Sequence, residues 1–381
     1  MTDTSERTDQ LEGQTLAEIG ADESIELAEQ AQRRQSLWAI RWILFRRSLR
    51  HNWALFWENR IGRFGLGIIA FFAVLAVMPT IFFATGYWNP AIYDPVTGLE
   101  PNPPVQRFTV VNEITDPATQ IDFTRVLLDN RIPNDVLPGD VVEIPLQPAP
   151  PDSRHWLGTD PLGRDVMSQL MHGARAAFFL GMLAAVVTVV IATIVGSVSA
   201  YFGGAIDAFF MRLADLLIMI PALAVLIVIG AIFEFQLWHL AVVIGILSGF
   251  GGTAIVLKSQ ALAVKVKPYI DAARVAGGSN THIIVSHVIP NVMPLSFLYM
   301  MFTVTGAIQS EATLSFLGLL NVRTSWGLML QLANNQGYLL QGLQYWWLLF
   351  PAGVAVTLLA MAFFLVGRAM DEVVNPRLRK R

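Results

Sequence analysis

Six stretches of the chain are long and almost continuously apolar. They cover approximately residues 65–85, 176–200, 213–233, 238–257, 291–311 and 346–367. A helix needs about 20 mainly apolar residues to cross roughly 30 Å of hydrocarbon, and a helix satisfies its own backbone hydrogen bonds, as lipid requires. The pattern therefore predicts an all-α membrane protein with six transmembrane helices. Gly203, Gly204 and Arg212 interrupt the apolar pattern after the second stretch, which predicts two helices joined there by a tight turn.

The segment between the first two apolar stretches, residues 86–155, has a different character. It contains strand-like pieces at 108–112 and 141–144 and is dense in proline. Proline lacks a backbone N–H and breaks helix interiors, so we expect no helix here. The segment predicts a small extracytoplasmic insertion of short strands and turns between helices 1 and 2. Its prolines are Pro90, Pro95, Pro101, Pro103, Pro104, Pro133, Pro138, Pro145, Pro148, Pro150 and Pro151.

Polar segments flank the apolar stretches at both ends of the chain. Residues 1–35 are rich in acids, which predicts a solvated cytoplasmic tail and is unlike a secretory leader, which needs a basic start and an apolar stretch. Residues 36–64 interleave tryptophan, phenylalanine and arginine, which is typical of an amphipathic helix at a membrane interface. A simple extension of the first span is the alternative. Residues 156–370 form a core with five spans, and residues 371–381 form a basic cytoplasmic tail.

The distribution of lysine and arginine predicts the orientation. Basic residues precede the first span and follow the second, fourth and sixth spans, whereas the loop 312–345 carries Arg323 alone. Cytoplasmic loops carry the excess of lysine and arginine, so both termini of this multi-pass membrane protein are expected in the cytoplasm. The composition agrees, because 54% of the residues are hydrophobic and 14% are charged, against about 25% charged residues in soluble domains.

Several kinds of chemistry lack the residues that they need. No glycine precedes a lysine, so the chain has no phosphate-binding loop for ATP. No His-Glu-x-x-His or Gly-x-Ser-x-Gly motif occurs, and cysteine is absent. His282 and His287 are five residues apart, which does not place two metal ligands on one helix face. The net charge of −3 gives no indication of nucleic-acid binding. We therefore expect a protein that is not an enzyme, with no catalytic residue, no metal and no cofactor.

The loop between the fourth and fifth spans has the pattern of two short helices. Pro268 and Asp271 are typical of a helix start, the alanines at 272, 273 and 276 make a slim helix, and Gly277-Gly278 ends it. Ser279 or Asn280 can cap a second helix that runs to His287, and Pro290 opens the fifth span. A slim helix of this kind fits a groove on another protein, although an ordinary surface loop would also have this pattern.

This loop resembles the coupling loop, or EAA loop, of ABC-importer permeases. The resemblance is carried by Asp271-Ala-Ala-Arg-Val-Ala-Gly277 and by Ile289-Pro290, with Asp271 where that family usually has Glu and Ile289 where it usually has Leu. Further stretches resemble the C-type subunits of oligopeptide and dipeptide permeases. They are His155-Trp-Leu-Gly-Thr-Asp-Pro-Leu-Gly-Arg-Asp165, Gly173-Ala-Arg175, Tyr201-Phe-Gly-Gly204, Arg212-Leu-Ala-Asp215 with Pro221, Glu311-Ala-Thr-Leu-Ser-Phe-Leu-Gly318, Ser325-Trp-Gly327 and the tail 371–379.

The resemblance covers roughly 60–381 and implies a function and partners. It implies a permease subunit of an ATP-driven importer in the lipid of the inner membrane. The implied partners are a second homologous permease, two P-loop ATPase subunits and an extracytoplasmic solute-binding protein. Nucleic acid is not an expected partner. The residues implied in ATPase coupling are Asp271, Ala272, Ala273, Arg274, Gly277, Gly278, Ile289 and Pro290. Peptides are the leading solute, with nickel complexes, opines and oligosaccharides as alternatives. Gly249-Phe-Gly-Gly-Thr-Ala254, a short segment after Gly318 and the long insertion depart from the family pattern.

Two acidic residues lie in or beside predicted spans. A charge near the bilayer centre costs about 2.5–3.5 kcal/mol on insertion scales, so Asp215 and Glu311 should face protein or water. They are candidates for a gate or pathway, or else for structural roles, with Arg212 as a possible partner for Asp215. The alternative function is a stand-alone secondary transporter or channel, which would use such acids as ion sites. Arg164 and Asp165 are expected to fix the shape of their loop.

Overall fold

The computed structural model describes residues 53–100, 103–116, 119–122, 136–145, 147–234 and 236–374. The chain divides into two units, residues up to Asn59 and residues from Arg60 onward. Of the first unit, the structure describes a helix over 53–58, in which Trp53 stacks on Phe56 and Trp57. The predicted acidic tail and most of the predicted interfacial helix lie outside the described residues.

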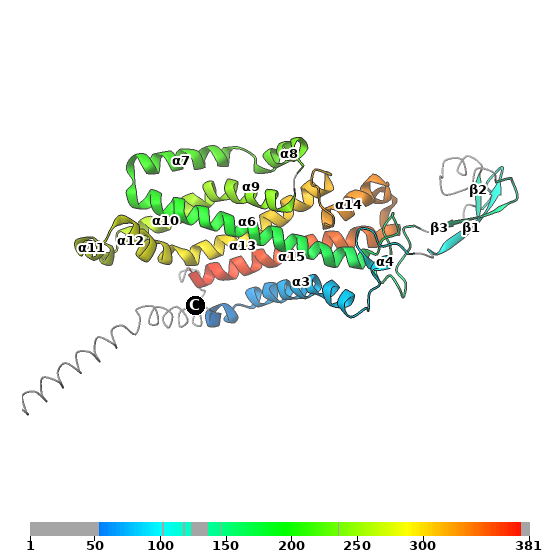
Figure 1. Cartoon of the computed structure of the whole chain (residues 1–381), viewed down its shortest axis with the longest axis horizontal. Helices are drawn as coiled ribbons and strands as arrows, with labels where there is room; N and C mark the ends of the chain where they lie inside the picture. Colours follow the sequence, from blue (N-terminus) through cyan, green and yellow to red (C-terminus); the bar gives the residue numbers. More distant parts are fainter. Residues whose placement is uncertain are drawn as a thin grey trace, which may run out of the picture. The chain divides into compact units, whose positions relative to one another are not determined.

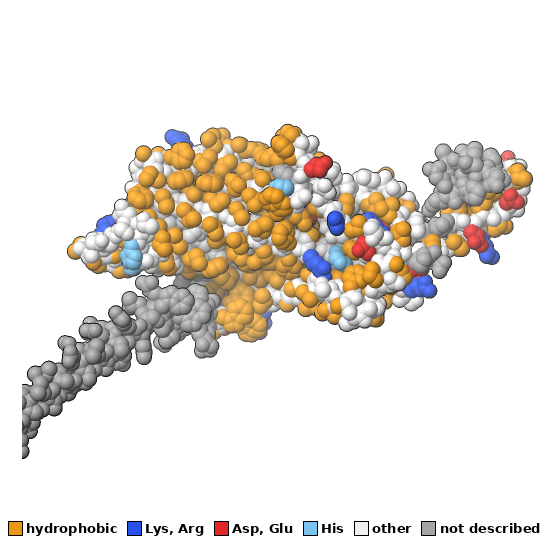
Figure 2. Space-filling view, viewed as in Figure 1, with side chains coloured by type: hydrophobic (Ala, Val, Ile, Leu, Met, Phe, Trp, Pro, Cys, Tyr) orange, Lys and Arg blue, Asp and Glu red, His pale blue; other side chains and the backbone are white. Residues whose placement is uncertain are grey.

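Within the second unit, four continuous helical segments are long and apolar enough to span a membrane, or up to six if each of two bent helix pairs is one span. The four contain α3 (Arg60–Ala84), α6 (Val166–Phe202), α13 (Ile289–Phe316) and α15 (Trp346–Val374). These helices lie side by side (Figure 1), and hydrophobic side chains dominate the middle of the face that Figure 2 shows. The part of the chain that is described is therefore mainly helical, with four to six candidate spans.

The long helices extend beyond the predicted apolar stretches. α3 begins at Arg60 rather than residue 65, so residues 60–64 continue the helix of the first candidate span. α15 continues to Val374, which places residues 371–374 in the helix instead of the predicted tail. Long basic side chains reach toward water from helix ends, so an apolar window underestimates how far such a helix continues.

α6 packs against α3, α9, α10 and α13 through small residues. A Cβ added to Gly181 would lie 2.8 Å from Val304 Cγ1 of α13, and one added to Gly196 would lie 2.7 Å from the Lys258 backbone nitrogen of α10. Small residues let membrane helices approach closely enough for van der Waals packing, which drives their association in lipid. Residue size therefore explains why α6, with its glycines and alanines, lies among so many helices.

The predicted third and fourth spans are not single straight helices. α7 (Gly204–Met219) and α8 (Ala222–Ile232) meet at 78°, and α9 (Leu237–Phe250) and α10 (Gly252–Lys265) meet at 44°. Pro221 causes the first break, because proline removes a helix donor and forces Ile220 into an extended conformation. The second break falls at Gly251. The expected tight turn before α7 is confirmed, since Gly203 and Gly204 have φ of 68° and 55°.

The remaining elements lie at opposite ends of the bundle (Figure 1). One end carries α11 (Pro268–Val275), α12 (Asn280–Ile283) and the π-helical segment η1 (Ile284–Val288). The other carries α4 (Pro90–Tyr93), α14 (Trp326–Asn335) and the 3₁₀ segment η2 (Tyr338–Tyr345). The bundle thus has one end built from the 266–288 loop and one built from the loops after α3 and α13.

The insertion contains a three-stranded sheet. β1 (Val105–Val111) lies between β2 (Gln120–Asp122), which is parallel to it, and β3 (Val141–Pro145), which is antiparallel. Strands therefore occur at both predicted pieces. The expectation that this segment holds no helix is wrong for one turn, α4, because Pro90 occupies its first position and Asn89 caps it through the backbone N–H of Ala91. Proline is well tolerated at that position, where the missing N–H has no helical acceptor.

Candidate functional site

The loop between α10 and α13 forms a short exposed helix held by a few buried side chains. α11 begins at Pro268, and Ile270 on its inner face is fully buried. Ile270 joins a hydrophobic cluster with Ile283, Ile284 and Val288 of the following segment and with residues of α6 and α10, and Ala273 packs against that cluster. The contacts fix α11 to the end of the bundle by one face only.

Within the described part of the chain, the opposite face of α11 is exposed. Asp271, Ala272, Arg274 and Gly277 are exposed, and Val275 is 90% exposed. Asp271 and Arg274 form an ion pair of 3.2 Å along the helix, and the Arg274 guanidinium lies 5.4 Å from the ring centroid of Tyr201. A slim helix whose outer face is exposed and whose inner face is packed on the bundle is the geometry expected of an element that inserts into a groove.

The turn after α11 depends on two consecutive glycines. Gly277 has φ of +84°, and a Cβ built on it meets nothing within 4 Å, whereas a Cβ on Gly278 would lie 2.8 Å from the carbonyl oxygen of Ala273. The backbone N–H of Gly278 donates to that same carbonyl at 2.9 Å. Ser279 then caps α12 by accepting from the N–H of His282. Gly277 is thus required for its conformation and Gly278 for close approach.

Ile289 and Pro290 start α13 directly from the π-helical segment, with Ile289 packed on the same cluster and Pro290 exposed. In this segment the argument from histidine spacing is wrong. The rings of His282 and His287 lie 5.8 Å apart, edge to face, because a π-helical turn is wider than an α-helical turn and closes hydrogen bonds between residues five apart. Within the described ranges, no group of three or more potential metal ligands accompanies them.

Glu311 lies at a junction of three helices. Its side chain is buried in α13 and accepts a hydrogen bond of 2.8 Å from Ser315 Oγ, with the side chain of Ser325 as a second partner. Ser325 caps α14, and the adjacent Trp326 donates from Nε1 to the carbonyl oxygen of Leu170 in α6. The junction therefore joins α6, α13 and α14 through residues that the sequence presents in separate motifs.

Among the described residues, Asp215 does not take part in the junction around Glu311. Its side chain is exposed on α7, and within the described part of the chain no ion pair joins it to Arg212 and no hydrogen bond joins it to Glu311. The possible Arg212 pair is therefore absent from this structure. α7 is instead tied to α10 by an ion pair of 2.5 Å between Asp207 and Lys258, which the sequence did not single out.

Ion pairs and hydrogen bonds of Asp160 and Asp165 hold the loop before α6. Arg164 Nη2 pairs with Asp160 at 2.6 Å, and Asp165 caps α6 by accepting from the N–H of Ser168 at 2.6 Å. Asp160 also accepts from Gln169 of α6. The expectation that Arg164 and Asp165 fix the loop agrees with these bonds.

Comparisons with known proteins agree with this architecture. Residues 190–380 match the family described as binding-protein-dependent transport system inner membrane component. The dipeptide transport system permease protein of Bacillus subtilis (strain 168) is 34% identical over 61% of this chain and 72% of its own length. The oligopeptide transport system permease proteins of Bacillus subtilis and Escherichia coli (strain K12) are 35% and 36% identical, over 61% and 60% of this chain and 74% of their own lengths.

Proposed function

Because the chain belongs to the family of binding-protein-dependent transport system inner membrane components, we propose that it is a pore-forming permease subunit of an ATP-driven importer of peptides or similar solutes. It is a multi-pass membrane protein of a transport family rather than an enzyme family. The named relatives act on dipeptides and oligopeptides, which makes peptides the first substrates to test.

The observation that carries the proposal is the half-buried α11. A permease without a nucleotide site needs a partner to supply energy, and the exposed outer face of α11 is where a P-loop ATPase subunit would dock. Ile270 and Ala273 connect that face to the ends of α6 and α10. ATP binding can bias the bundle only if the partner binds one conformation more tightly than another, and α11 offers the contact through which this difference would act.

The arrangement of basic residues supports an orientation with α11 in the cytoplasm. The contact of Lys265 Nζ with the Ala200 carbonyl oxygen places the ends of α6 and α10 together, and the contact of Trp347 with Thr159 places the start of α15 at the other end. The α11 end therefore carries the basic residues Arg60, Arg63, Lys265, Lys267, Arg274 and Arg368. By the positive-inside rule this end is cytoplasmic. In this orientation both termini lie in the cytoplasm and the insertion lies outside.

The partners of the proposed importer follow from this orientation. A second, homologous permease subunit completes the pore, two ATPase subunits bind the cytoplasmic loops, and a solute-binding protein delivers the solute at the outer face. The alternative of a stand-alone secondary transporter needs intramembrane acids as ion sites, but Asp215 is exposed and Glu311 is held by serines. The surroundings of neither acid favour a stand-alone transporter.

Substitution of Val275 by aspartate tests the docking role. The side chain is 90% exposed, so Val275→Asp leaves the folded chain intact while placing a charge in the proposed interface. Burying an unpaired charge at the centre of an interface costs about 2 kcal/mol or more, which lowers ATPase affinity by roughly 30-fold. Val141→Asp on the exposed β3 position, 61% exposed, is the control.

The measurement is co-purification of the complex followed by peptide uptake in proteoliposomes. We expect Val275→Asp to weaken retention of the ATPase subunit that docks on α11 and to lose uptake, and Val141→Asp to retain the ATPases and uptake. Retention of ATPases and uptake by Val275→Asp would show that α11 is not the coupling element.

A further inference from the structure

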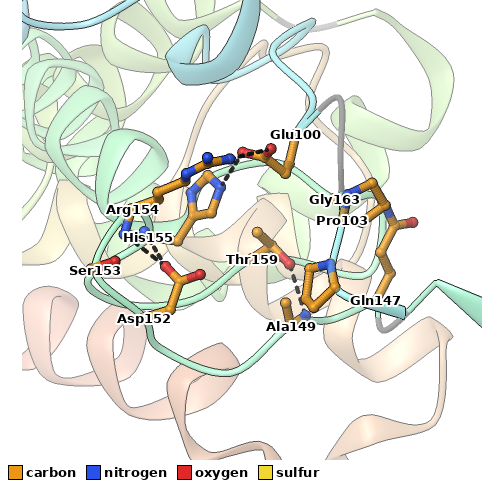
Figure 3. A pocket seen from close by; sticks show the side chains of 11 residues that line it. Glu100, Pro103, Gln147, Ala149, Asp152, Ser153, Arg154, His155, Thr159 and Gly163 are labelled. Carbon is orange, nitrogen blue, oxygen red and sulfur yellow. Dashed lines mark hydrogen bonds and ion pairs between the residues drawn. The ribbon is translucent and has the colours of Figure 1, made fainter. Parts of the chain in front are cut away.

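A buried histidine lies between two carboxylates where the insertion meets the first turn of α6. His155 Nδ1 lies 2.7 Å from Asp165 Oδ2 and its Nε2 lies 3.2 Å from Glu100 Oε2. The three side chains are 4%, 2% and 4% exposed. Arg154, which is largely exposed, pairs with the other oxygen of Glu100 at 3.0 Å. Figure 3 shows Arg154 and His155 both pointing at Glu100 beside a cavity of about 190 Å³.

This geometry is best satisfied by one extra proton on His155. A neutral imidazole has one N–H, so it can donate to one carboxylate while its other nitrogen presents a lone pair to the second. An imidazolium donates to both. With that proton, the three buried side chains of His155, Glu100 and Asp165 together carry one negative charge instead of two, and burial disfavours the larger charge.

The groups around His155 act in the same direction. Burial by itself disfavours the imidazolium, but the hydrogen bond and charge of Asp165, the hydrogen bond of Glu100 and the charge of Asp152 outweigh it and raise the pKa of His155 above its ordinary 6.5. The ring and charged groups that face it come from α4, the segment after α4, its own loop and α6: Tyr93, Glu100, Asp152, Arg154 and Asp165.

We propose that His155 is a positioning residue whose bound proton ties Glu100 of the insertion to Asp165 at the start of α6, and that loss of this proton loosens the outer end of the transport pathway. We call Glu100, Arg154, His155 and Asp165 the latch. Asp165 also caps α6 through Ser168, and Ser168 Oγ donates to the Tyr93 carbonyl oxygen, so the latch holds α4, its following segment and α6 together. The transport consequence rests on the proposed function, but the proton-dependent tie does not.

The sign of the pH dependence follows from linkage. Because the folded-state pKa is raised, the stabilisation is complete below pH 6.5 and is lost as pH rises through the folded-state pKa. Between these two values, the equilibrium constant for closing the latch falls by up to about tenfold per pH unit. Raising the pH through the folded-state pKa of His155 therefore opens the latch, and pH below 6.5 holds it closed.

The Glu100→Gln variant tests whether the link between position 100 and Asp165 depends on the extra proton of His155. A glutamine amide can donate to Nε2 of a neutral His155 while Nδ1–H donates to Asp165, so the three buried side chains carry one negative charge without an extra proton. This variant should keep the latch closed at alkaline pH. Glu143→Gln is the matched control, since Glu143 is a half-exposed carboxylate of the same insertion and pairs with the exposed Arg107.

The first experiment is NMR titration of histidine-labelled full-length protein in lipid nanodiscs, with the His155 signal assigned by its loss in His155→Gln. We expect His155 to titrate above pH 6.5 in the unmodified protein and in Glu143→Gln, and well below that in Glu100→Gln. Titration at or below 6.5 in the unmodified protein, or no change in Glu100→Gln, would overturn the proton-bound latch.

The second experiment measures hydrogen exchange in the first turn of α6, corrected for the intrinsic pH dependence, and then uptake by the assembled transporter. Protection should fall with pH above 6.5 in the unmodified protein and stay level in Glu100→Gln. Pathway control predicts that Glu100→Gln also flattens the pH profile of uptake. Level protection in both proteins refutes the tie, and an unchanged uptake profile with a working latch refutes its role in transport. Failure of the ATPases to assemble would refute the proposed function and leave the exchange result standing.

Discussion

Replacing Gly277 in a graded series distinguishes two reasons for a glycine at the end of α11. The residue has φ of +84°, and among the described residues no atom lies within 4 Å of an added Cβ. Within the isolated subunit the cost of a side chain is therefore conformational rather than steric. Alanine at a positive φ costs about 1 kcal/mol, valine more because it is β-branched, and asparagine less because its side chain tolerates the left-handed region.

Docking of the ATPase adds a second effect, side-chain size, which ranks asparagine and alanine at position 277 in the opposite order. If backbone conformation limits α11, ATPase affinity should fall in the order Gly, Asn, Ala, Val at position 277, with about a fivefold loss for alanine, since 1.4 kcal/mol corresponds to tenfold. If a tight groove on the ATPase limits it, asparagine should be worse than alanine because it is larger. The order of asparagine and alanine therefore identifies the cause.

The assay is titration of ATPase subunits onto the permease in nanodiscs, followed by coupled uptake. Gly67→Ala in α3 is the control, because Gly67 is helical and its Cβ would also meet nothing within 4 Å. We expect it to change ATPase affinity by less than the alanine variant at 277. Equal affinity of the valine variant and the unmodified protein would refute both explanations and remove the turn from the coupling mechanism.

Three further predictions concern packing, orientation and the insertion. Gly173→Ala places a Cβ 2.5 Å from Trp326 Cδ1, so it should destabilise the protein by about 1–3 kcal/mol, measured as a lower unfolding midpoint in detergent; an unchanged midpoint would contradict the close packing. A reporter fused after residue 120 should be extracytoplasmic and one after residue 275 cytoplasmic, and swapped signals would overturn the orientation. Excising residues 103–146 should reduce uptake more than membrane insertion, and normal uptake would show that the sheet is dispensable.

The sequence predicts elements well where a local signal decides them. Pro268, Asp271, Gly277 and Ser279 specify a helix, a left-handed turn and a cap over twelve residues, and the structure places each as expected. Apolar windows find the long helices but not their ends, since basic residues such as Arg60 extend a helix past its hydrocarbon core. The signal for the missed bend was present in Pro221, which a hydropathy window averages away.

Other features have no local signal. The π-helical turn that brings His282 beside His287 depends on how the 266–288 loop closes onto α6 and α10. The pairing of His155 with Glu100 spans 55 residues and that of Trp326 with Leu170 spans 156. Such contacts follow from helix packing rather than from spacing along the chain, so no sequence pattern could have identified them.

The two sites argued from this structure meet on one helix. The carboxyl end of α6 supplies Ala200 and Tyr201 to the cluster that anchors α11, and its amino end is capped by Asp165 of the latch. α6 has 37 residues, about 55 Å of helix, without an internal proline. A helix of this length without a break transmits a tilt at one end to the other, whereas the bent pairs α7–α8 and α9–α10 can absorb motion at Pro221 and Gly251. Movement of α11 on ATP binding should therefore reach the latch through α6.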